Sequence, residues 1–317
     1  MLDEPSREEL EAAHCWEADD RVASRPAMTA FRRRTRYQQA QWREAHGHPI
    51  GTQPIVPRPA VTVRPAGSRV PLEYGRTTGA GFVSPAALAA ARARTSFVER
   101  QQSFDHQRLW ADLLSSEALS FNLFGDLGAD IGRADRAVHR WWPDTPGTVR
   151  DIRFAHSPGR LDPSYLNSLR DFDAAFVLDT GGGTRAVVAV DVKFFERNKI
   201  EQPKPSNAAR NMEVCERSHA FTPEVGRLLG RTDLAVLWLE HLLLLSMLQH
   251  ESHEWTWGRY VVVYPADNPD VVDLLARYRG YLADDSTFAT MTLEDLLASR
   301  ALPAATTKAL RDRYATR

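Results

Sequence analysis

Two kinds of hydrophobic pattern share the second half of the chain. Short runs rich in β-branched and aromatic residues predict strands at Thr148–Phe154, Asp173–Asp179, Ala186–Phe195 and Arg259–Tyr264. Apolar residues at helical spacing predict helices over Asp105–Phe124, Ser164–Arg170, Asn207–Ala220 and Asp233–Gln249. The tail then alternates helix, short strand and helix. Helices packed around a small mixed β-sheet, an α/β fold, are the assembly that this order favours.

The N-terminal region has a different pattern. A polar helix is predicted at Ser6–Asp20, and a second, basic helix at Met28–His46. From Pro49 to about Phe82 the chain is rich in proline and glycine, as is typical of an extended arm or linker. Helical spacing resumes at Pro85. We therefore expect a helical and Pro/Gly-rich extension over residues 1–82 and a main domain over residues 83–317.

Composition and charge exclude several classes of protein. The 317 residues are 43% hydrophobic, enough for a sizeable core, and the formal net charge is −1. A polyanionic partner would therefore have to bind at a local basic patch. Only two cysteines occur, Cys15 and Cys215, which argues against a disulfide scaffold and fits a reducing cytoplasm. The acidic N-terminus does not resemble a signal peptide.

The most apolar segment, Leu234–Leu248, does not predict a membrane span. It is shorter than the roughly 20 residues that a spanning helix needs. It also contains Glu240 and His241. A buried core helix is the better interpretation, and we expect no association with a membrane.

A glycine-rich turn joins two of the predicted strands. Thr180–Thr184 contains three consecutive glycines, but no Lys-Ser/Thr follows and the next element is a strand. A hairpin turn is therefore favoured over a phosphate-binding loop. If the turn is centred on Gly182, Asp173 lies directly opposite Asp191. Two carboxylates at that spacing repel each other.

A lysine joins these two carboxylates. Because side chains alternate along a strand, Asp191 and Lys193 share one face and Val192 points to the other. Three charged groups in apolar strands are costly unless a cation bridges the carboxylates. Each residue alone could be a surface ion pair or a turn cap. The three together favour a functional site.

Glu117 is a candidate third carboxylate. It lies within the apolar stripe that Trp110, Leu113, Leu114, Phe121 and Phe124 form along the predicted helix. Glutamate is rarely buried unless it is paired or bound to a metal. The alternatives are a hydrogen-bonded core acid or a helix-end residue that faces solvent.

The densest basic run lies in the second predicted helix and comprises Arg32, Arg33, Arg34 and Arg36. It is the best local candidate for contacts with nucleic acid phosphates. The alternative is a solvated, charged helix face.

The order of these motifs resembles the PD-(D/E)XK nuclease superfamily, with Asp173 followed by Asp191-Val192-Lys193. More narrowly, the blocks SSEALSFNLFG, DFDAAFVLD, VDVKFFE and YVVVYPADNP resemble those of a bacterial family of restriction-endonuclease-like proteins. The similarity extends over roughly Asp105–Pro269. Phe172 replaces the proline of the motif's name, and Asp191 replaces the more frequent glutamate.

The resemblance implies a restriction-endonuclease-like core and hydrolysis of phosphodiester bonds, with DNA cleavage in restriction or defence as the leading expectation. It implies that Mg²⁺, for which Mn²⁺ can substitute, is held by Asp173 and Asp191. Glu117 is a candidate third ligand, and Lys193 positions or activates the attacking water. Glu196 could join them only if the strand bends.

Alternatives to this function stay open. RNA or a small phosphodiester could be the substrate instead of DNA. The protein could also form a homodimer. A catalytically silent nuclease-like fold that binds nucleic acid or a partner protein is the alternative from a different class.

Overall fold

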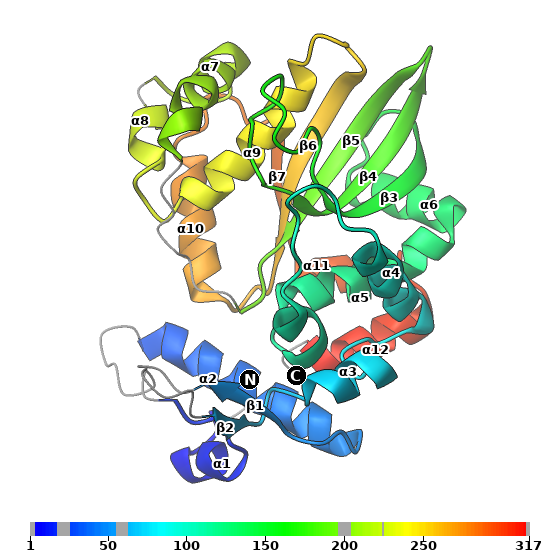
Figure 1. Ribbon diagram of the computed structural model, residues 1–317, viewed down its shortest axis with the longest axis vertical. Coiled ribbons are helices and arrows are strands. Elements are labelled where there is room, and N and C mark those ends of the chain that lie inside the picture. The colour runs from blue at the N-terminus through cyan, green and yellow to red at the C-terminus, as the bar shows by residue number, and fades with distance from the viewer. Residues whose placement is uncertain (1–3, 18–25, 55–62, 196–203, 224, 315–317) are drawn as a thin grey trace.

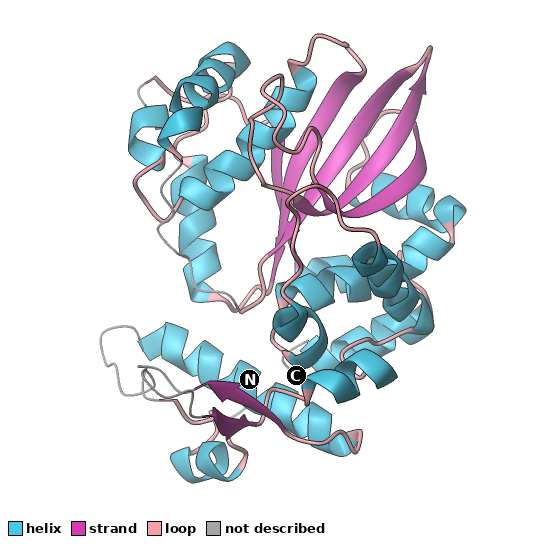
Figure 2. Cartoon of the chain, in the orientation of Figure 1, coloured by secondary structure: helices cyan, strands magenta, loops and turns pink. Residues whose placement is uncertain are grey.

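A five-stranded mixed sheet forms the centre of the fold in the computed structural model, which describes residues 4–17, 26–54, 63–195, 204–223 and 225–314 (Figures 1 and 2). The strands lie in the order β3-β4-β5-β6-β7. β3, β4 and β5 pair antiparallel, whereas β5, β6 and β7 pair parallel. Their bounds are Thr148–His156, Phe172–Gly181, Thr184–Val192, Trp255–Tyr264 and Phe288–Thr292. The predicted α/β fold with a small mixed sheet is confirmed.

Helices cover both faces of the sheet. One face packs against α4, α5, α6, α11 and α12, which span Pro85–Ser96, Ser116–Ala129, Ile131–Trp141, Leu293–Ala298 and Ala304–Tyr314. The other packs against α7, α8, α9 and α10, which span Ala208–Ser218, Val225–Leu229, Ala235–Leu248 and Pro269–Arg279. Alternation along β4 sends Ala174 and Phe176 to the first layer and Ala175 and Val177 to the second.

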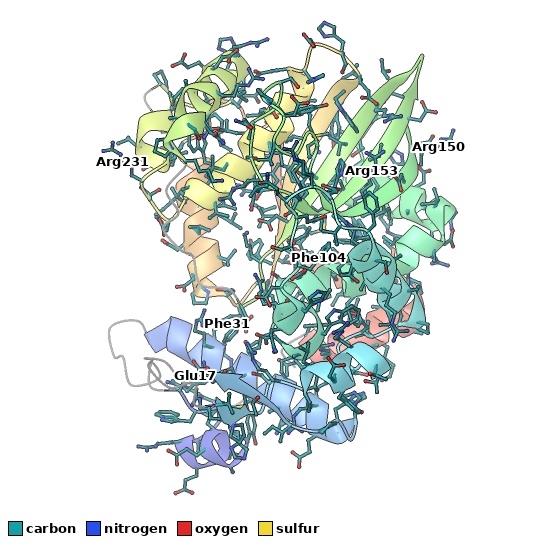
Figure 3. The ribbon with its side chains drawn as sticks, in the orientation of Figure 1. Glu17, Phe31, Phe104, Arg150, Arg153 and Arg231 are labelled. Atoms are coloured by element: carbon teal, nitrogen blue, oxygen red, sulfur yellow. The ribbon has the colours of Figure 1, made fainter. Side chains whose placement is uncertain are left out.

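β3 is an edge strand and carries charge along its length. Arg150 and Arg153 project from it at the border of the sheet (Figure 3). Arg150 pairs with Asp179 at 3.7 Å, and Arg153 pairs with Asp151 at 2.8 Å. Charged edge strands discourage pairing with the strands of other molecules.

The β4–β5 hairpin has the expected register. Ala174 pairs with Val190 and Phe176 with Val188, so the next position places Asp173 opposite Asp191. Gly181, Gly182 and Gly183 all have positive φ, with values of 87°, 63° and 83°. Non-glycine residues rarely adopt this conformation, which explains the three consecutive glycines.

The Pro/Gly-rich segment is not an extended arm, and that prediction is wrong for its described residues. After α1 (Arg7–Ala12) and α2 (Pro26–Ala45), it forms β1 (Gly51–Pro54), β2 (Val63–Ala66) and α3 (Leu72–Thr78). Its glycines allow close backbone packing, because a Cβ on Gly51, Gly67 or Gly75 would collide with Val70, Ala13 or Trp110, respectively. In this segment the glycines allow neighbouring backbones to pack closely, and they do not indicate a flexible linker.

The single helix predicted over Asp105–Phe124 is also wrong. A short π-helical turn, Gln107–Ala111, precedes a break, and α5 begins at Ser116. The backbone of residues 111–113 instead bonds to residues 68–70, with Val70 N donating to Ala111 O at 3.0 Å and Leu113 N to Ser68 O at 3.0 Å. A helix cannot continue through a segment whose backbone groups pair elsewhere.

Residues 164–170 form a loop where a helix was predicted. Asn167 has φ 50°, outside the helical region. Side chains of α7 and of the residue before it satisfy the loop's carbonyl groups: Arg210 donates to Ser164 O and Tyr165 O, and Asn207 donates to Asn167 O at 2.8 Å. Tertiary hydrogen bonds therefore replace helical ones.

A buried arginine joins the N-terminal extension to the last helix. Arg313 of α12 has no exposed surface. Its guanidinium donates to Gln39 Oε1 at 3.0 Å, to Gly81 O at 2.6 Å and to Leu113 O at 3.2 Å. It also lies 4.4 Å from the centre of the Trp42 ring. Three segments far apart in sequence therefore meet at one side chain.

We expect Arg313→Met to destabilise the protein by about 3 kcal/mol or more, because the substitution leaves buried acceptors without donors. Urea unfolding would measure the change. Lys308→Met on the same helix is the control, since Lys308 is exposed and its ion pair with Asp312 contributes little. Equal stability of the two variants would contradict the proposed role of Arg313.

Candidate active site

Charged side chains gather at the ends of β4 and β5, beneath α9. Asp173 comes from β4, Asp191 from β5 and Lys193 from the residues directly after β5. α9 contributes Glu240, and β6 contributes Tyr260. Asp191 is 6% exposed and Glu240 is 8% exposed, so this cluster lies within the apolar layer between sheet and helix.

Strand alternation brings Asp191 and Lys193 together, as the sequence predicted. Lys193 Nζ lies 2.5 Å from Asp191 Oδ2, whereas Val192 and Phe194 pack into the opposite layer. The backbone N of Lys193 donates to Val263 O at 2.8 Å, which continues the pairing with β6 beyond the end of β5. Lys193 is therefore held in an extended conformation.

Glu240 and Tyr260 close the cluster from the other side. Tyr260 Oη lies 3.0 Å from Asp191 Oδ2 and 2.8 Å from Glu240 Oε2. A phenol carries one proton, so it can donate to only one of these carboxyl groups. Both hydrogen bonds form together when Glu240 is protonated and donates to Tyr260, which in turn donates to Asp191.

The pKa values of the two acids support this arrangement. Burial, followed by the charge of Asp191, raises the pKa of Glu240 to about 8. Asp191 is also opposed by burial, but Lys193 and its hydrogen bonds outweigh that effect and lower its pKa to about 2. Glu240 is thus neutral and Asp191 ionised near neutral pH.

The surroundings of Asp173 favour its neutral form. Burial, and then the adjacent Asp191, raise the pKa of Asp173 well above its ordinary value. One carboxylate oxygen accepts a hydrogen bond from Val192 N at 2.7 Å, which fixes the orientation of the side chain. Binding of a cation would reverse the protonation of Asp173, because a metal ligand must be ionised.

Two cationic groups border the carboxyl groups. Burial opposes the charge on Lys193, but Asp191 and Glu240 raise its pKa, so its ammonium stays protonated. Lys193 Nζ lies 3.7 Å from Glu240 Oε2. Arg170 contacts the other oxygen of Glu240, Oε1, at 3.4 Å.

The donor set fits a hard divalent cation. Asp173 and Asp191 are adjacent carboxyl groups whose mutual repulsion a cation would relieve. Within the described ranges, no group of three His, Cys, Asp or Glu side chains is arranged to hold a metal ion. A cation here would therefore take two carboxylates and water, an arrangement that Mg²⁺ accepts.

Glu117 lies on the other layer of the fold. It is half-buried in the first turn of α5, a helix that packs through Phe121 and Phe124 against the opposite face of the sheet from Asp173 and Asp191. The stripe argument for Glu117 is wrong, because Trp110 belongs to a separate turn. The metal role of Glu117 itself stays a prediction. Glu196 lies outside the described residues.

The basic run of α2 contributes to intramolecular contacts. Arg32 donates to Phe195 O at 2.8 Å, and Arg36 donates to Cys15 O at 2.8 Å. Arg33 pairs with Glu4, and Arg34 lies 3.3 Å from Asp267. These arginines support the fold, and their contact with nucleic acid stays a prediction.

Sequence reasoning missed three residues of the cluster: Arg170, Glu240 and Tyr260. Glu240 had a visible signal, since it is a charged residue within the apolar segment Leu234–Leu248. Nothing in the local pattern of Arg170 or Tyr260 distinguishes them from an ordinary surface arginine and a core aromatic residue.

Comparison with known proteins gives one match. The model of the PD-(D/E)XK nuclease superfamily matches residues 20–316, nearly the whole chain. No curated protein and no solved structure matches the chain.

We expect the effect of Glu240→Gln on the free energy of unfolding of the metal-free protein to depend on pH. Compared with the parent, the variant should gain on the order of 2 kcal/mol of stability between pH 5 and pH 8. The pKa of Glu240 is about 8 in the folded chain and 4.5 ordinarily. Between these two pH values the unfolded chain binds fewer protons than the folded chain, so the stability of the parent falls as pH rises. Glutamine lacks this effect.

Urea unfolding of parent and variant across this pH range would measure the difference. A difference in stability that does not change with pH would contradict the buried, protonated state of Glu240.

Proposed function

We propose that this chain, which belongs to the PD-(D/E)XK nuclease superfamily, is a Mg²⁺-dependent endonuclease that hydrolyses phosphodiester bonds of DNA. The supporting observation is the convergence of Asp173, Asp191 and Lys193 on one buried spot. This is the set of groups that metal-assisted phosphodiester hydrolysis needs. A bound Mg²⁺ would polarise the phosphoryl oxygen and lower the pKa of an attacking water.

Asp173 and Asp191 would hold the cation. Asp191 is already ionised, whereas Asp173 gives up its proton when the cation arrives. The hydrogen bond from Val192 N keeps Asp173 aimed at the shared spot. Mn²⁺ also prefers oxygen ligands and would substitute for Mg²⁺.

Lys193 would act as a cation and not as a base. Its pKa is raised, so the ammonium keeps its proton at neutral pH and cannot accept one from water. It can instead donate hydrogen bonds to the attacking water and to a phosphoryl oxygen, and so offset the charge that develops there. Glu240 and Tyr260 would position Lys193 and Asp191 through their shared hydrogen bonds.

The finer parts of the proposal rest on the sequence and on the state of the cysteines. DNA as substrate and a role in restriction or defence follow from the similarity of four sequence blocks to restriction-endonuclease-like proteins. A cytoplasmic location agrees with two free, buried cysteines. Among the described residues, no helix is both long and apolar enough to cross a membrane.

We expect Asp191→Asn, Lys193→Ala and Lys193→Arg each to reduce cleavage by about 10²-fold or more, since each removes one electrostatic stabiliser. Arginine should fail because a planar guanidinium cannot reproduce the position of a compact ammonium. Single-turnover cleavage of labelled DNA at saturating Mg²⁺ would measure the loss.

Asp179→Asn is the matched control, since Asp179 lies at the far, exposed end of β4. Near-parental cleavage by Lys193→Ala would refute the assigned role of the lysine. DNA binding by a parent that cleaves no substrate would favour the catalytically silent fold.

Glu117→Gln tests the predicted third ligand. If α5, which packs on the opposite face of the sheet, keeps Glu117 out of the site, the Mg²⁺ requirement should be unchanged. A Mg²⁺ titration of cleavage would test this. A rise in the half-saturating Mg²⁺ concentration by about tenfold would make Glu117 a third ligand, as the sequence suggested.

A further inference from the structure

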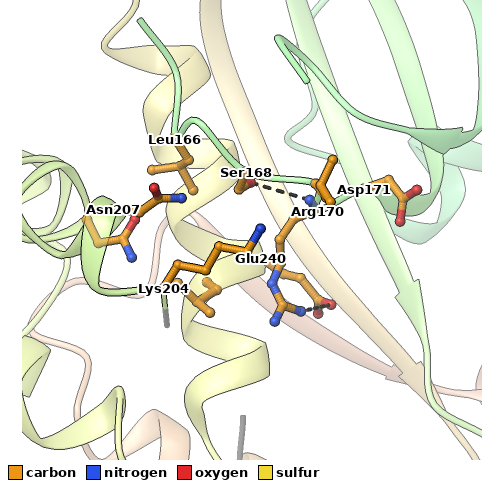
Figure 4. Close-up of a pocket in the computed structure, with 10 residues that line it drawn as sticks. Leu166, Ser168, Arg170, Asp171, Lys204, Asn207 and Glu240 are labelled. Carbon is orange, nitrogen blue, oxygen red and sulfur yellow. Dashed lines mark hydrogen bonds and ion pairs between the residues drawn. The ribbon is translucent and has the colours of Figure 1, made fainter. Parts of the chain in front are cut away.

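A pocket opens directly beside the proposed active site (Figure 4). It has a volume of about 350 Å³ and shares Arg170 and Glu240 with the charged cluster. The loop of residues 164–171 forms one wall, and α9 and the start of α7 form the others. Its volume is at the lower end of the range for small-molecule sites, so it suits one small ligand and not a double helix.

Asn211 supplies an amide group to the wall of the pocket. Its side chain lines the pocket and is only 3% exposed. Among the described residues, its polar atoms are not in the set of fully buried atoms that lack a hydrogen-bond partner, so the amide borders the pocket space. A bound group that offers a donor beside an acceptor would pair with it there.

The mouth of the pocket is cationic. Lys204 extends across it toward Arg170 (Figure 4), and within the described ranges Lys204 has no acidic partner. Each of the two acids on the lining lies beside an arginine. Arg170 donates to Glu240 Oε1 at 3.4 Å. Asp171 pairs with Arg160 at 3.1 Å.

The remaining lining is apolar, from Leu166, Leu169 and Leu239. Flat aromatic rings pack well against such side chains, and a nucleobase has an apolar face and a polar edge. The pocket therefore combines a cationic mouth, an apolar wall and a buried amide, which match the phosphate, the face and the edge of one nucleotide.

The wall of the pocket is held rigidly. Arg160 donates to Leu169 O at 3.1 Å, Asn207 donates to Asn167 O at 2.8 Å, and Arg210 secures Ser164 and Tyr165. The loop also holds Asn167 at φ 50°. Non-glycine residues in this region persist only where the surroundings fix them, and such positions cluster at ligand sites.

We propose that this pocket receives one unstacked nucleotide of the substrate strand, next to the phosphate that is cleaved. The proposal rests on the function proposed above and adds a substrate class. A base that is paired and stacked in a duplex cannot enter, so the preferred substrate has an unpaired nucleotide at the cleavage point. Arg170 and Lys204 contact its phosphate, and Asn211 reads its base edge.

A binding experiment tests the pocket without cleavage. Deoxyadenosine 5′-monophosphate should bind the metal-free parent, and inorganic phosphate should bind more weakly. Asn211→Leu and Lys204→Ala should each weaken nucleotide binding about tenfold, as loss of one base or phosphate contact does. Arg217→Ala, which removes the same charge as Lys204→Ala from the exposed end of α7, should have no effect. Isothermal titration calorimetry would measure these affinities.

Cleavage of matched DNA substrates provides the second readout. The parent should cleave a strand with an unpaired nucleotide at least about tenfold faster than the fully paired duplex. Lys204→Ala should raise the KM for the unpaired substrate, and because Lys204 is exposed this variant does not endanger folding.

The outcomes separate the two proposals. Nucleotide binding by a parent that cleaves nothing would overturn the proposed function but not the pocket. Cleavage of duplex and unpaired DNA at equal rates, with unchanged nucleotide binding by Asn211→Leu, would overturn the pocket proposal alone.

Discussion

The ion pair between Lys193 and Asp191 determines the protonation of the whole cluster. It lies in an apolar layer, where an isolated charge is costly, and Lys193 and Arg170 together cannot compensate three ionised acids. Asp191 makes the closest contact with Lys193, 2.5 Å, and stays ionised, so the pKa values of Asp173 and Glu240 are raised. In the proposed function, Asp173 would exchange its proton for a cation in this layer.

Restraints on both sides of Lys193 fix the geometry of this pair. The pairing with β6 continues past the end of β5, and Asn268 donates to Phe194 O at 3.0 Å. Arg32 of the N-terminal extension donates to Phe195 O and lies 4.4 Å from the centre of the Phe195 ring. The extension therefore supports the segment that carries the lysine, although its described strands, β1 and β2, are not part of the five-stranded sheet.

Local patterns in the sequence were sufficient for the sheet and for half of the cluster. The glycine turn fixes the hairpin register, and strand alternation then places Asp191 and Lys193 on one face. Glu240 and Tyr260 could not be placed in this way, because their contacts depend on how α9 lies across the sheet. The helix predicted at Ser164–Arg170 failed for a similar reason, since side chains of distant residues satisfy its backbone.

The contact between Gln39 and Arg313 joins residues separated by 274 positions and sets an order of assembly. During synthesis α2 emerges long before its buried partner in α12. The interface between α2 and α12 can therefore close only when translation has passed Arg313. Native contacts of such long range slow folding, because the intervening chain must be ordered before they form. This order delays the support that α2 gives to the segment after Lys193 until Arg313 has been synthesised.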